Sequence, residues 1–114
     1  MDQFEKLQEY FQILGDARRL RIINFIGKQE RTVSEIINET GLSQPLVSHH
    51  LKVLKNNQIV VTKREGAFIL YKLKDIKFLN ILGVLTEILL KEDLKDADKP
   101  IFSAPACWKN TCGK

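Results

Sequence analysis

Apolar residues recur at helical spacing from the start of the chain, which predicts three amphipathic helices before residue 42. The first covers residues 2–14, and its apolar positions are Phe4, Leu7, Phe11 and Leu14. Asp16 can cap a second helix that ends near Gly27, with apolar positions at Leu20, Ile22, Ile23 and Ile26. A third, short helix begins at Thr32 or Ser34 and ends at Gly41, where a left-handed backbone costs least.

A fourth helix follows directly, because Ser43 is a good N-cap and Pro45 is tolerated in a first helical turn. Its inward stripe, at i, i+3, i+4 and i+7, is Val47, His50, Leu51 and Leu54, so the polar residues Gln44, Ser48, His49 and Lys52 face solvent. On that stripe, we expect His50 to be a core histidine that bonds a backbone carbonyl rather than a ligand. Two short helices joined by a glycine-containing turn predict a helix-turn-helix.

Beyond Asn57 the hydrophobic period falls to about two, which predicts strands over residues 59–62 and 68–73. Residues 63–67 between them supply a glycine for the reversal and the cations Lys63 and Arg64, as in a charged β-hairpin wing. Asp75 then caps a long helix to about Lys91. The predicted fold is mainly α with a two-stranded hairpin wing, in the order α-α-α-α-β-β-α.

The long helix is apolar around more of its circumference than one buried stripe requires. A second surface must cover it, and a homodimer that also uses the first helix meets that need. The expected dimer contacts are Phe4, Leu7, Phe11, Ile76, Leu79, Leu82 and Leu89.

The composition fits one compact, water-soluble domain: 114 residues, 44% hydrophobic and 28% charged, with 6 Gly and 3 Pro. We expect the domain to cover residues 1–92 and a polar tail to cover residues 93–114. The longest apolar stretch, 78–90, is too short and too polar to span a bilayer, and acidic residues near the N-terminus do not resemble an export signal. These features predict a cytoplasmic protein, in which the two cysteines are thiols.

The positive charge is concentrated in one part of the chain. Residues 43–74 carry six Lys or Arg against Glu65 alone, a net charge of +5, although the whole chain carries only +4. A polyanion such as double-stranded DNA is the natural partner of this segment, because each neutralised phosphate releases counterions. The alternative is an ordinary solvated helix and hairpin surface.

Four segments carry a resemblance, and they are Leu14-Gly-Asp-Ala-Arg-Arg-Leu-Arg-Ile22, Gly41-Leu-Ser-Gln-Pro-Leu-Val-Ser-His-His-Leu-Lys-Val-Leu54, Lys63-Arg-Glu-Gly66 and Tyr71-Lys-Leu73. In order and spacing they resemble the ArsR/SmtB family of winged-helix repressors, over about residues 5 to 90. The resemblance implies a dimeric bacterial or archaeal repressor that binds an inverted-repeat operator and leaves it when an effector binds. The predicted DNA contacts are Ser43, Gln44, Ser48, His49, Lys52, Lys63 and Arg64. Arg18, Arg19 and Arg21 either touch the DNA backbone or form surface pairs.

The two metal sites that the resemblance implies lack their ligands here. Family members that sense thiophilic metals carry Cys-Val-Cys where this chain has Thr32-Val33-Ser34. Others hold zinc with Asp, His, His and Glu between terminal helices, and the matching positions here are Asp75, Lys77, Ile88 and Lys91. No cofactor is required for DNA binding.

Only the tail offers soft donors. Cys107 and Cys112 can bind arsenite or another thiophilic ion with a third donor, can close a disulfide under oxidation, or can have no regulatory role. Two other classes of protein remain open: a winged helix that docks a protein, and a thiol-redox enzyme. The charge of residues 43–74 disfavours the first, and the spacing and terminal position of the cysteines disfavour the second. The sequence contains no catalytic constellation, so we predict that the chain is not an enzyme.

Overall fold

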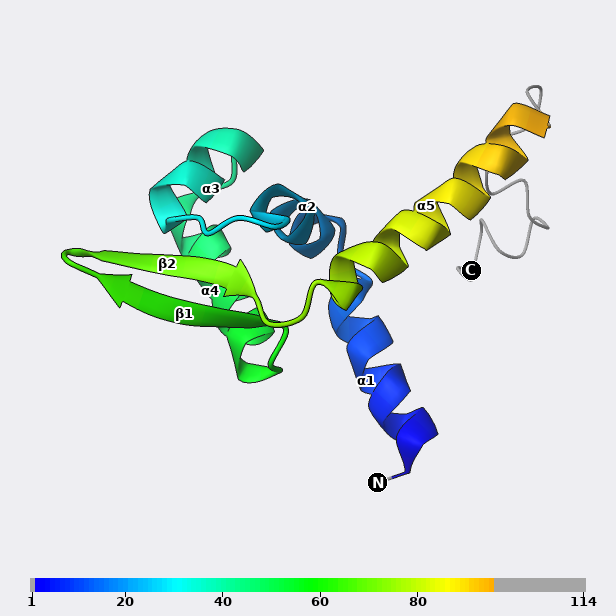
Figure 1. The fold of residues 1–114 in the computed structure, drawn as a ribbon, viewed down its shortest axis with the longest axis horizontal. Helices are drawn as coiled ribbons and strands as arrows, with labels where there is room; N and C mark the ends of the chain where they lie inside the picture. The colour runs from blue at the N-terminus through cyan, green and yellow to red at the C-terminus, as the bar shows by residue number, and fades with distance from the viewer. Residues whose placement is uncertain (1, 96–114) are drawn as a thin grey trace. The chain divides into compact units, whose positions relative to one another are not determined.

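The computed structural model describes the backbone of residues 2–95 and the side chains of residues 2–91. Within this part, the elements follow the predicted order of a winged helix-turn-helix (Figure 1). They are α1 (Gln3–Leu14), α2 (Ala17–Ile26), α3 (Val33–Thr40), α4 (Gln44–Asn56), β1 (Val60–Glu65), β2 (Phe68–Leu73) and α5 (Lys77–Lys95).

The helices begin at the residues that the sequence supplies as caps. The Asp16 carboxylate accepts hydrogen bonds from the backbone N–H groups of Arg18 and Arg19 at 2.8 and 3.4 Å. Thr32 and Glu35 form a reciprocal capping box at the start of α3, and the Ser43 hydroxyl accepts from the Leu46 N–H at the start of α4. Local hydrogen bonding therefore fixes where α2, α3 and α4 begin.

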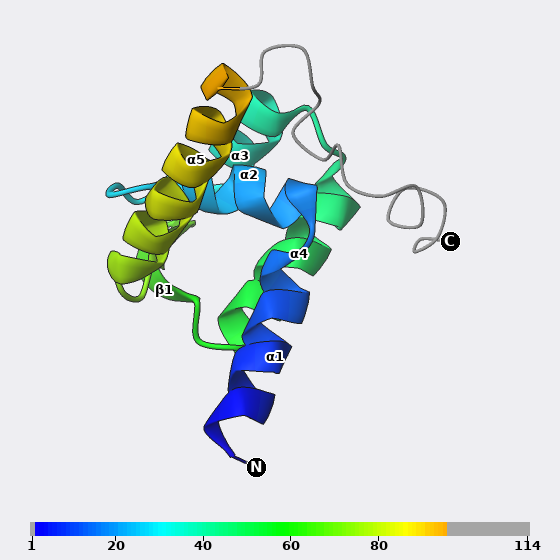
Figure 2. The same ribbon diagram turned by 90° about the vertical axis from the view of Figure 1, so that its right-hand side faces the viewer.

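The core lies between α2, α3, α4 and the base of the hairpin. Its fully or almost fully buried apolar residues are Ile22, Ile23, Ile26, Ile36, Val47, Leu51, Leu54, Ile59, Val60 and Leu73. The predicted inward stripe of α4 is confirmed, since Val47, Leu51 and Leu54 belong to this set and His50 is only 2% exposed. Because one side of α4 is committed to the core, its exposed residues lie on the other side. Helices α2, α3 and α4 lie against one another in both views (Figure 1 and Figure 2).

The hairpin differs from the sequence prediction at its first strand. β1 continues to Glu65 instead of ending at residue 62, so the connection is only Gly66 and Ala67. Gly66 has φ of 63° as the first of the two central residues, which suits a two-residue hairpin turn. The strand is longer than predicted because antiparallel pairing, from Val60 with Leu73 to Glu65 with Phe68, accepts charged residues where one face meets water. Lys63 and Arg64 consequently lie in a strand and not in a loop.

The final helix also differs from its prediction, since it extends to Lys95 and not to about Lys91. Asp75 caps it as predicted, accepting a hydrogen bond from the Lys77 N–H at 2.9 Å. Residues up to Leu79 form one compact unit, and α5 continues from Asn80 into a second. Many apolar side chains of α5 are exposed, and they are Ile81, Val84, Leu85, Ile88, Leu89 and Leu90. The predicted tail, apart from the backbone of residues 93–95, lies outside the described residues.

Candidate nucleic-acid interface

The outer face of α4 brings together the polar side chains singled out in the sequence. Gln44, Ser48 and Lys52 are spaced four residues apart, so they form one ridge along the helix, and His49 lies beside it. All four are exposed. The Ser43 hydroxyl uses its oxygen to cap α4, at 3.3 Å from the Leu46 nitrogen, and keeps its own hydrogen to donate. We name Gln44, Ser48, His49 and Lys52 the α4 face.

The turn between α3 and α4 sets how this face is presented. Gly41 has a left-handed backbone, with φ of 74°, and its N–H donates to the Ile37 carbonyl. The Thr40 hydroxyl donates to the Ile36 carbonyl at 2.7 Å and accepts from the Leu42 N–H at 3.3 Å. These bonds satisfy the end of α3 and fix the direction in which the chain enters α4.

The two predicted wing cations lie on opposite faces of the hairpin. Lys63 pairs across the strands with Leu70 and Arg64 with Ile69, and adjacent strand residues point to opposite sides. The Lys63 ammonium lies 3.9 Å from a Glu30 carboxylate oxygen and 3.5 Å from one of Glu65. Arg64 makes no ion pair within the described residues. Arg64 is therefore more available than Lys63 for contact with a phosphate.

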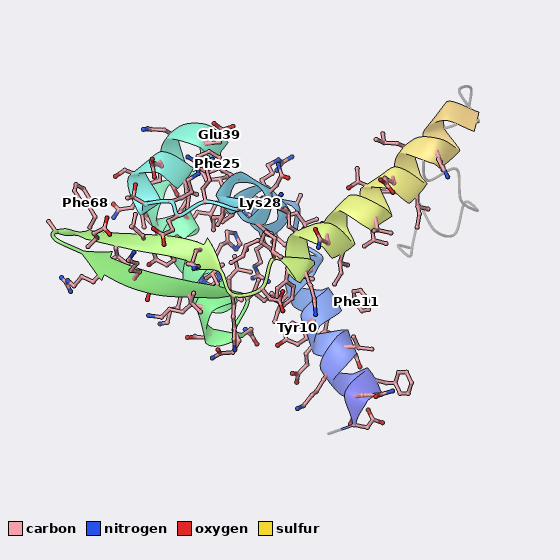
Figure 3. All side chains as sticks on the ribbon, viewed as in Figure 1. Tyr10, Phe11, Phe25, Lys28, Glu39 and Phe68 are labelled. Atoms are coloured by element: carbon pink, nitrogen blue, oxygen red, sulfur yellow. The ribbon has the colours of Figure 1, made fainter. Side chains whose placement is uncertain are left out.

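Sequence reasoning missed Phe68, which it assigned only to a strand. Phe68 is 64% exposed and lies beside the hairpin turn (Figure 3). The signal was its place, two residues after Gly66, because side chains at the end of a projecting hairpin lie beyond the core. Phe68 pairs across the strands with Glu65, so it lies on the same face of the hairpin as Lys63 and on the opposite face from Arg64. An exposed aromatic ring at this end of the hairpin is suited to contact a nucleic acid.

His50 is buried as predicted, but the predicted partner is wrong. Its Nδ1 accepts a hydrogen bond from Nε of Arg19 at 3.1 Å, instead of the ring donating to a backbone carbonyl. Its Nε2 is buried and has no partner among the described residues. Burial is the main cause that lowers the pKa of His50; the Asp16 carboxylate opposes it, and the guanidinium groups of Arg19 and Arg18 add to it. The neutral ring is thus the form that fits this position.

The arginines of α2 have different surroundings. Arg18 pairs with Asp16 at 3.2 Å, and this hydrogen-bonded contact holds the pKa of Asp16 at about 2. Arg19 turns inward, and its Nη1 donates to the Ile13 carbonyl at 3.1 Å. Arg21 lines a hollow of about 560 Å³ together with Arg31 and Glu39. Arg18 therefore forms a surface ion pair, one of the two roles expected for these arginines. Arg19 forms neither a surface pair nor an outward-facing contact, because its guanidinium group bonds Ile13 and His50.

Nothing in the described residues forms a metal centre. They contain no group of three or more His, Cys, Asp or Glu side chains that could hold an ion. The side chains of Thr32 and Asp75 serve as helix caps. Cys107 and Cys112 lie outside the part that the structure describes.

Sequence matches to known proteins identify the family to which this chain belongs. The model of the arsR family of bacterial regulatory proteins matches residues 16–61, which contain the whole helix-turn-helix. An HTH-type transcriptional regulator of Methanocaldococcus jannaschii is 34% identical over 89 residues, which are 77% of this chain and 100% of that protein. The chain belongs to the arsR family. Its resemblance to ArsR/SmtB repressors is thereby confirmed.

Other arsR-family relatives extend the comparison. The arsenical resistance operon repressor of Staphylococcus aureus is 28% identical over 101 residues, covering 83% of this chain and 97% of that repressor. The homodimeric winged helix-turn-helix DNA-binding domain of a possible ArsR-family regulator from Mycobacterium bovis superposes with a TM-score of 0.66 at 26% identity, covering 81% of this chain and 84% of that domain.

Membership of the arsR family confirms two further predictions. The fold is the winged helix-turn-helix of ArsR-type repressors. The family consists of DNA-binding transcriptional regulators, so this chain is a repressor of that type and not an enzyme, and the thiol-redox enzyme is excluded. In the described part of the chain, no helix is long and apolar enough to cross a membrane.

Proposed function

We propose that this ArsR-type repressor acts in the cytoplasm as a homodimer that reads an inverted-repeat operator with the α4 face of each protomer. The observation that carries the proposal is the exposure of all four residues of that face on the second helix of the helix-turn-helix. Such a helix enters the major groove, and two copies related by a twofold axis reach half-sites one helical turn apart.

The chemistry of the α4 face suits the reading of bases. A Gln amide such as that of Gln44 can bond adenine through two atoms, and a Lys ammonium such as that of Lys52 can donate to guanine. Ser48 and His49 can each donate or accept at a base edge or a phosphate. Ser43, at the start of α4, can donate its hydroxyl hydrogen to a phosphate.

The wing supplies contacts of another kind. Arg64 and Lys63 approach the flanking phosphates or the minor groove, and Phe68 lies at the same end of the hairpin. Because Lys63 is already near two carboxylates, Arg64 is the main contributor of charge.

The homodimer is supported by apolar surface that the described chain leaves in water. On α1, Phe4, Leu7 and Phe11 are exposed, and no residue of this helix is buried. Phe11 and Tyr10 leave α1 on different sides (Figure 3), and Tyr10 instead bonds the Asn57 carbonyl at the end of α4. On α5 and just before it, Ile76 and Leu89 are exposed, while Leu79 and Leu82 are half-buried. The relative from M. bovis is itself a homodimer.

Selection from random DNA tests this function directly. The full chain is incubated with a pool of duplexes that carry a random central region, and bound duplexes are sequenced and measured for affinity against salt concentration. We expect a twofold-symmetric sequence, bound at least about 1,000-fold more tightly than random duplex, and an affinity that falls steeply with salt. Equal affinity for selected and random duplexes would overturn the proposal and favour a winged helix that docks a protein.

We also propose that a thiophilic effector acts at Cys107 and Cys112. The chain contains two cysteines in total, and the described residues contain no group of three or more metal-ligating side chains. Two thiolates with a third donor from the partner chain or solvent suit arsenite or a similar soft ion, and oxidation could instead join them in a disulfide. The S. aureus relative is a repressor of an arsenical resistance operon.

A titration separates these possibilities. Arsenite, cadmium chloride and diamide are added in turn to complexes of the selected operator with wild-type protein and with a Cys107→Ser, Cys112→Ser double variant. We expect one of the three to weaken operator binding by wild type up to about 100-fold, a size typical of allosteric coupling, and to leave the double variant unaffected. An identical response from both proteins would show that the cysteines have no sensing role.

A further inference from the structure

Arg19 joins three helices of the first unit through one guanidinium group. It belongs to α2, its Nη1 donates to the carbonyl of Ile13 in the last turn of α1, and its Nε donates to Nδ1 of His50 in α4. Both hydrogen bonds are 3.1 Å long. The side chain is half-buried and His50 is 2% exposed, so water competes only weakly for these bonds.

A second hydrogen bond joins the same part of α1 to the C-terminal end of α4. The Tyr10 hydroxyl donates to the carbonyl of Asn57, the C-cap of α4, at 3.3 Å. Tyr10 and Ile13 are three residues apart and therefore lie on one side of α1. Helix α4 is thus attached to α1 at its middle, through His50 and Arg19, and at its end, through Asn57.

We propose that Arg19 and Tyr10 are positioning residues that hold α4 at a fixed angle to α1, and so set the spacing of half-sites that the repressor accepts. The proposal rests on the proposed function, in which α1 contacts the partner protomer and α4 enters the major groove. Two attachment points fix the direction of a helix, whereas one leaves it free to pivot. A pivot in each protomer changes the separation of the two α4 faces.

The geometry also fixes the protonation state of His50. Because Arg19 has only donors, Nδ1 must be unprotonated, and the hydrogen of the neutral ring resides on Nε2. Protonation of Nδ1 would remove the acceptor and place a cation against Arg19 and Arg18, with His49 adjacent on α4 and Asp16 as the compensating carboxylate. The attachment therefore requires neutral His50.

The test uses the full chain and the operator obtained by selection, together with duplexes in which one base pair is inserted between the half-sites. One base pair shifts the half-sites by about 3.4 Å and rotates one of them about the DNA axis. The measured quantity is the ratio of affinities for the original and the expanded operator. Loss of overall stability lowers both affinities and leaves this ratio unchanged.

The variants distinguish the effect of losing the hydrogen bonds between α1 and α4 from the effects of changing the charge or the core packing. Arg19→Lys keeps the charge but cannot reach both partners. Arg21→Lys makes the same replacement at an exposed position of α2 that lines a hollow with Arg31 and Glu39. His50→Asn retains an acceptor close to the place of Nδ1, whereas His50→Leu fills the core better and has no acceptor. Tyr10→Phe removes only the hydroxyl.

We expect Arg19→Lys, Tyr10→Phe and His50→Leu each to lower the ratio about threefold to tenfold, the effect of removing one hydrogen bond. Arg21→Lys should leave the ratio unchanged, and His50→Asn should preserve it better than His50→Leu. Nitrogen NMR of the wild type should show His50 protonated at Nε2 and not at Nδ1. If the ratio is unchanged in Arg19→Lys, Tyr10→Phe and His50→Leu, or if the proton is on Nδ1, the proposal that these residues position α4 is wrong. A wild type that does not discriminate selected from random duplex overturns the proposed function instead.

Discussion

Lys63 and Arg64 are neighbours in β1 whose side chains lie on opposite faces of the hairpin, and among the described residues Lys63 pairs with carboxylates whereas Arg64 does not. The ion pairs with Glu30 and Glu65 are exposed, so each contributes little to stability. They nevertheless compete with phosphate for the Lys63 ammonium. The two wing cations are therefore not equivalent, although they are adjacent in the sequence.

Replacement of the wing cations should reveal this difference in the salt dependence of DNA binding. Arg64→Gln should reduce the slope of log affinity against log salt by about one for each half-site, as expected when one phosphate is no longer neutralised. Lys63→Gln should reduce it by less. Lys28→Gln, which removes a charge from the hollow at the base of the hairpin, serves as control and should leave the slope unchanged. Equal reductions for Arg64 and Lys63 would contradict the ranking.

Removal of side chains from the α4 face should reduce discrimination more than affinity in general. Ser48→Ala with His49→Ala should weaken binding to the selected operator by about 1–3 kcal/mol for each base that is no longer read. Binding to random duplex should change much less. The matched control is Ser34→Ala with Asn38→Ala, two exposed polar residues on α3. If operator and random duplex lose affinity equally in fluorescence anisotropy titrations, α4 does not read bases.

The role of α1 in the homodimer can be tested with two phenylalanines of similar exposure. Phe11 on α1 is 62% exposed and Phe68 on the hairpin is 64% exposed. Phe11→Glu should shift the dimer to monomer in sedimentation equilibrium, because it buries a charge in an apolar contact. Phe68→Glu should leave the dimer intact. A dimer that survives Phe11→Glu would remove α1 from the interface.

The turn of the helix-turn-helix should be sensitive to the residue at position 41. An added Cβ at Gly41 meets no atom within 4 Å, so the cost of Gly41→Ala comes only from the left-handed backbone at φ of 74°. That cost is about 1–2 kcal/mol, and a melting temperature lower by about 4–8 °C for each kcal/mol should follow. Gly41→Asn should lose less, since Asn tolerates this conformation. Thermal unfolding followed by circular dichroism would measure both, and equal losses would contradict a backbone origin.

Acid should remove the contribution of Asp16 to stability. Its pKa in the folded protein is about 2, below the ordinary value near 4, so the folded state favours the carboxylate. This contribution is complete above the unfolded pKa and is lost as the pH falls from about 4 through 2. The difference in urea unfolding between wild type and Asp16→Asn should therefore be larger at pH 6 than at pH 2. A difference that does not change with pH would show that the Arg18 contact does not depend on the charge.

The sequence by itself determined the order of the elements, the caps, the buried stripe of α4 and its exposed polar face. These follow from spacing over three or four residues and from side chains that bond nearby N–H groups, so neighbours along the chain carry the information. Only the tertiary structure decided the partner of Arg19. Helical spacing places Arg19 on the same side of α2 as Ile22 and Ile26, but its partner His50 is 31 residues away and cannot be identified from the local pattern. The length of β1 and the carboxylates beside Lys63 were likewise decided by segments that meet in space, because strand pairing and ion pairs join residues that the sequence keeps apart.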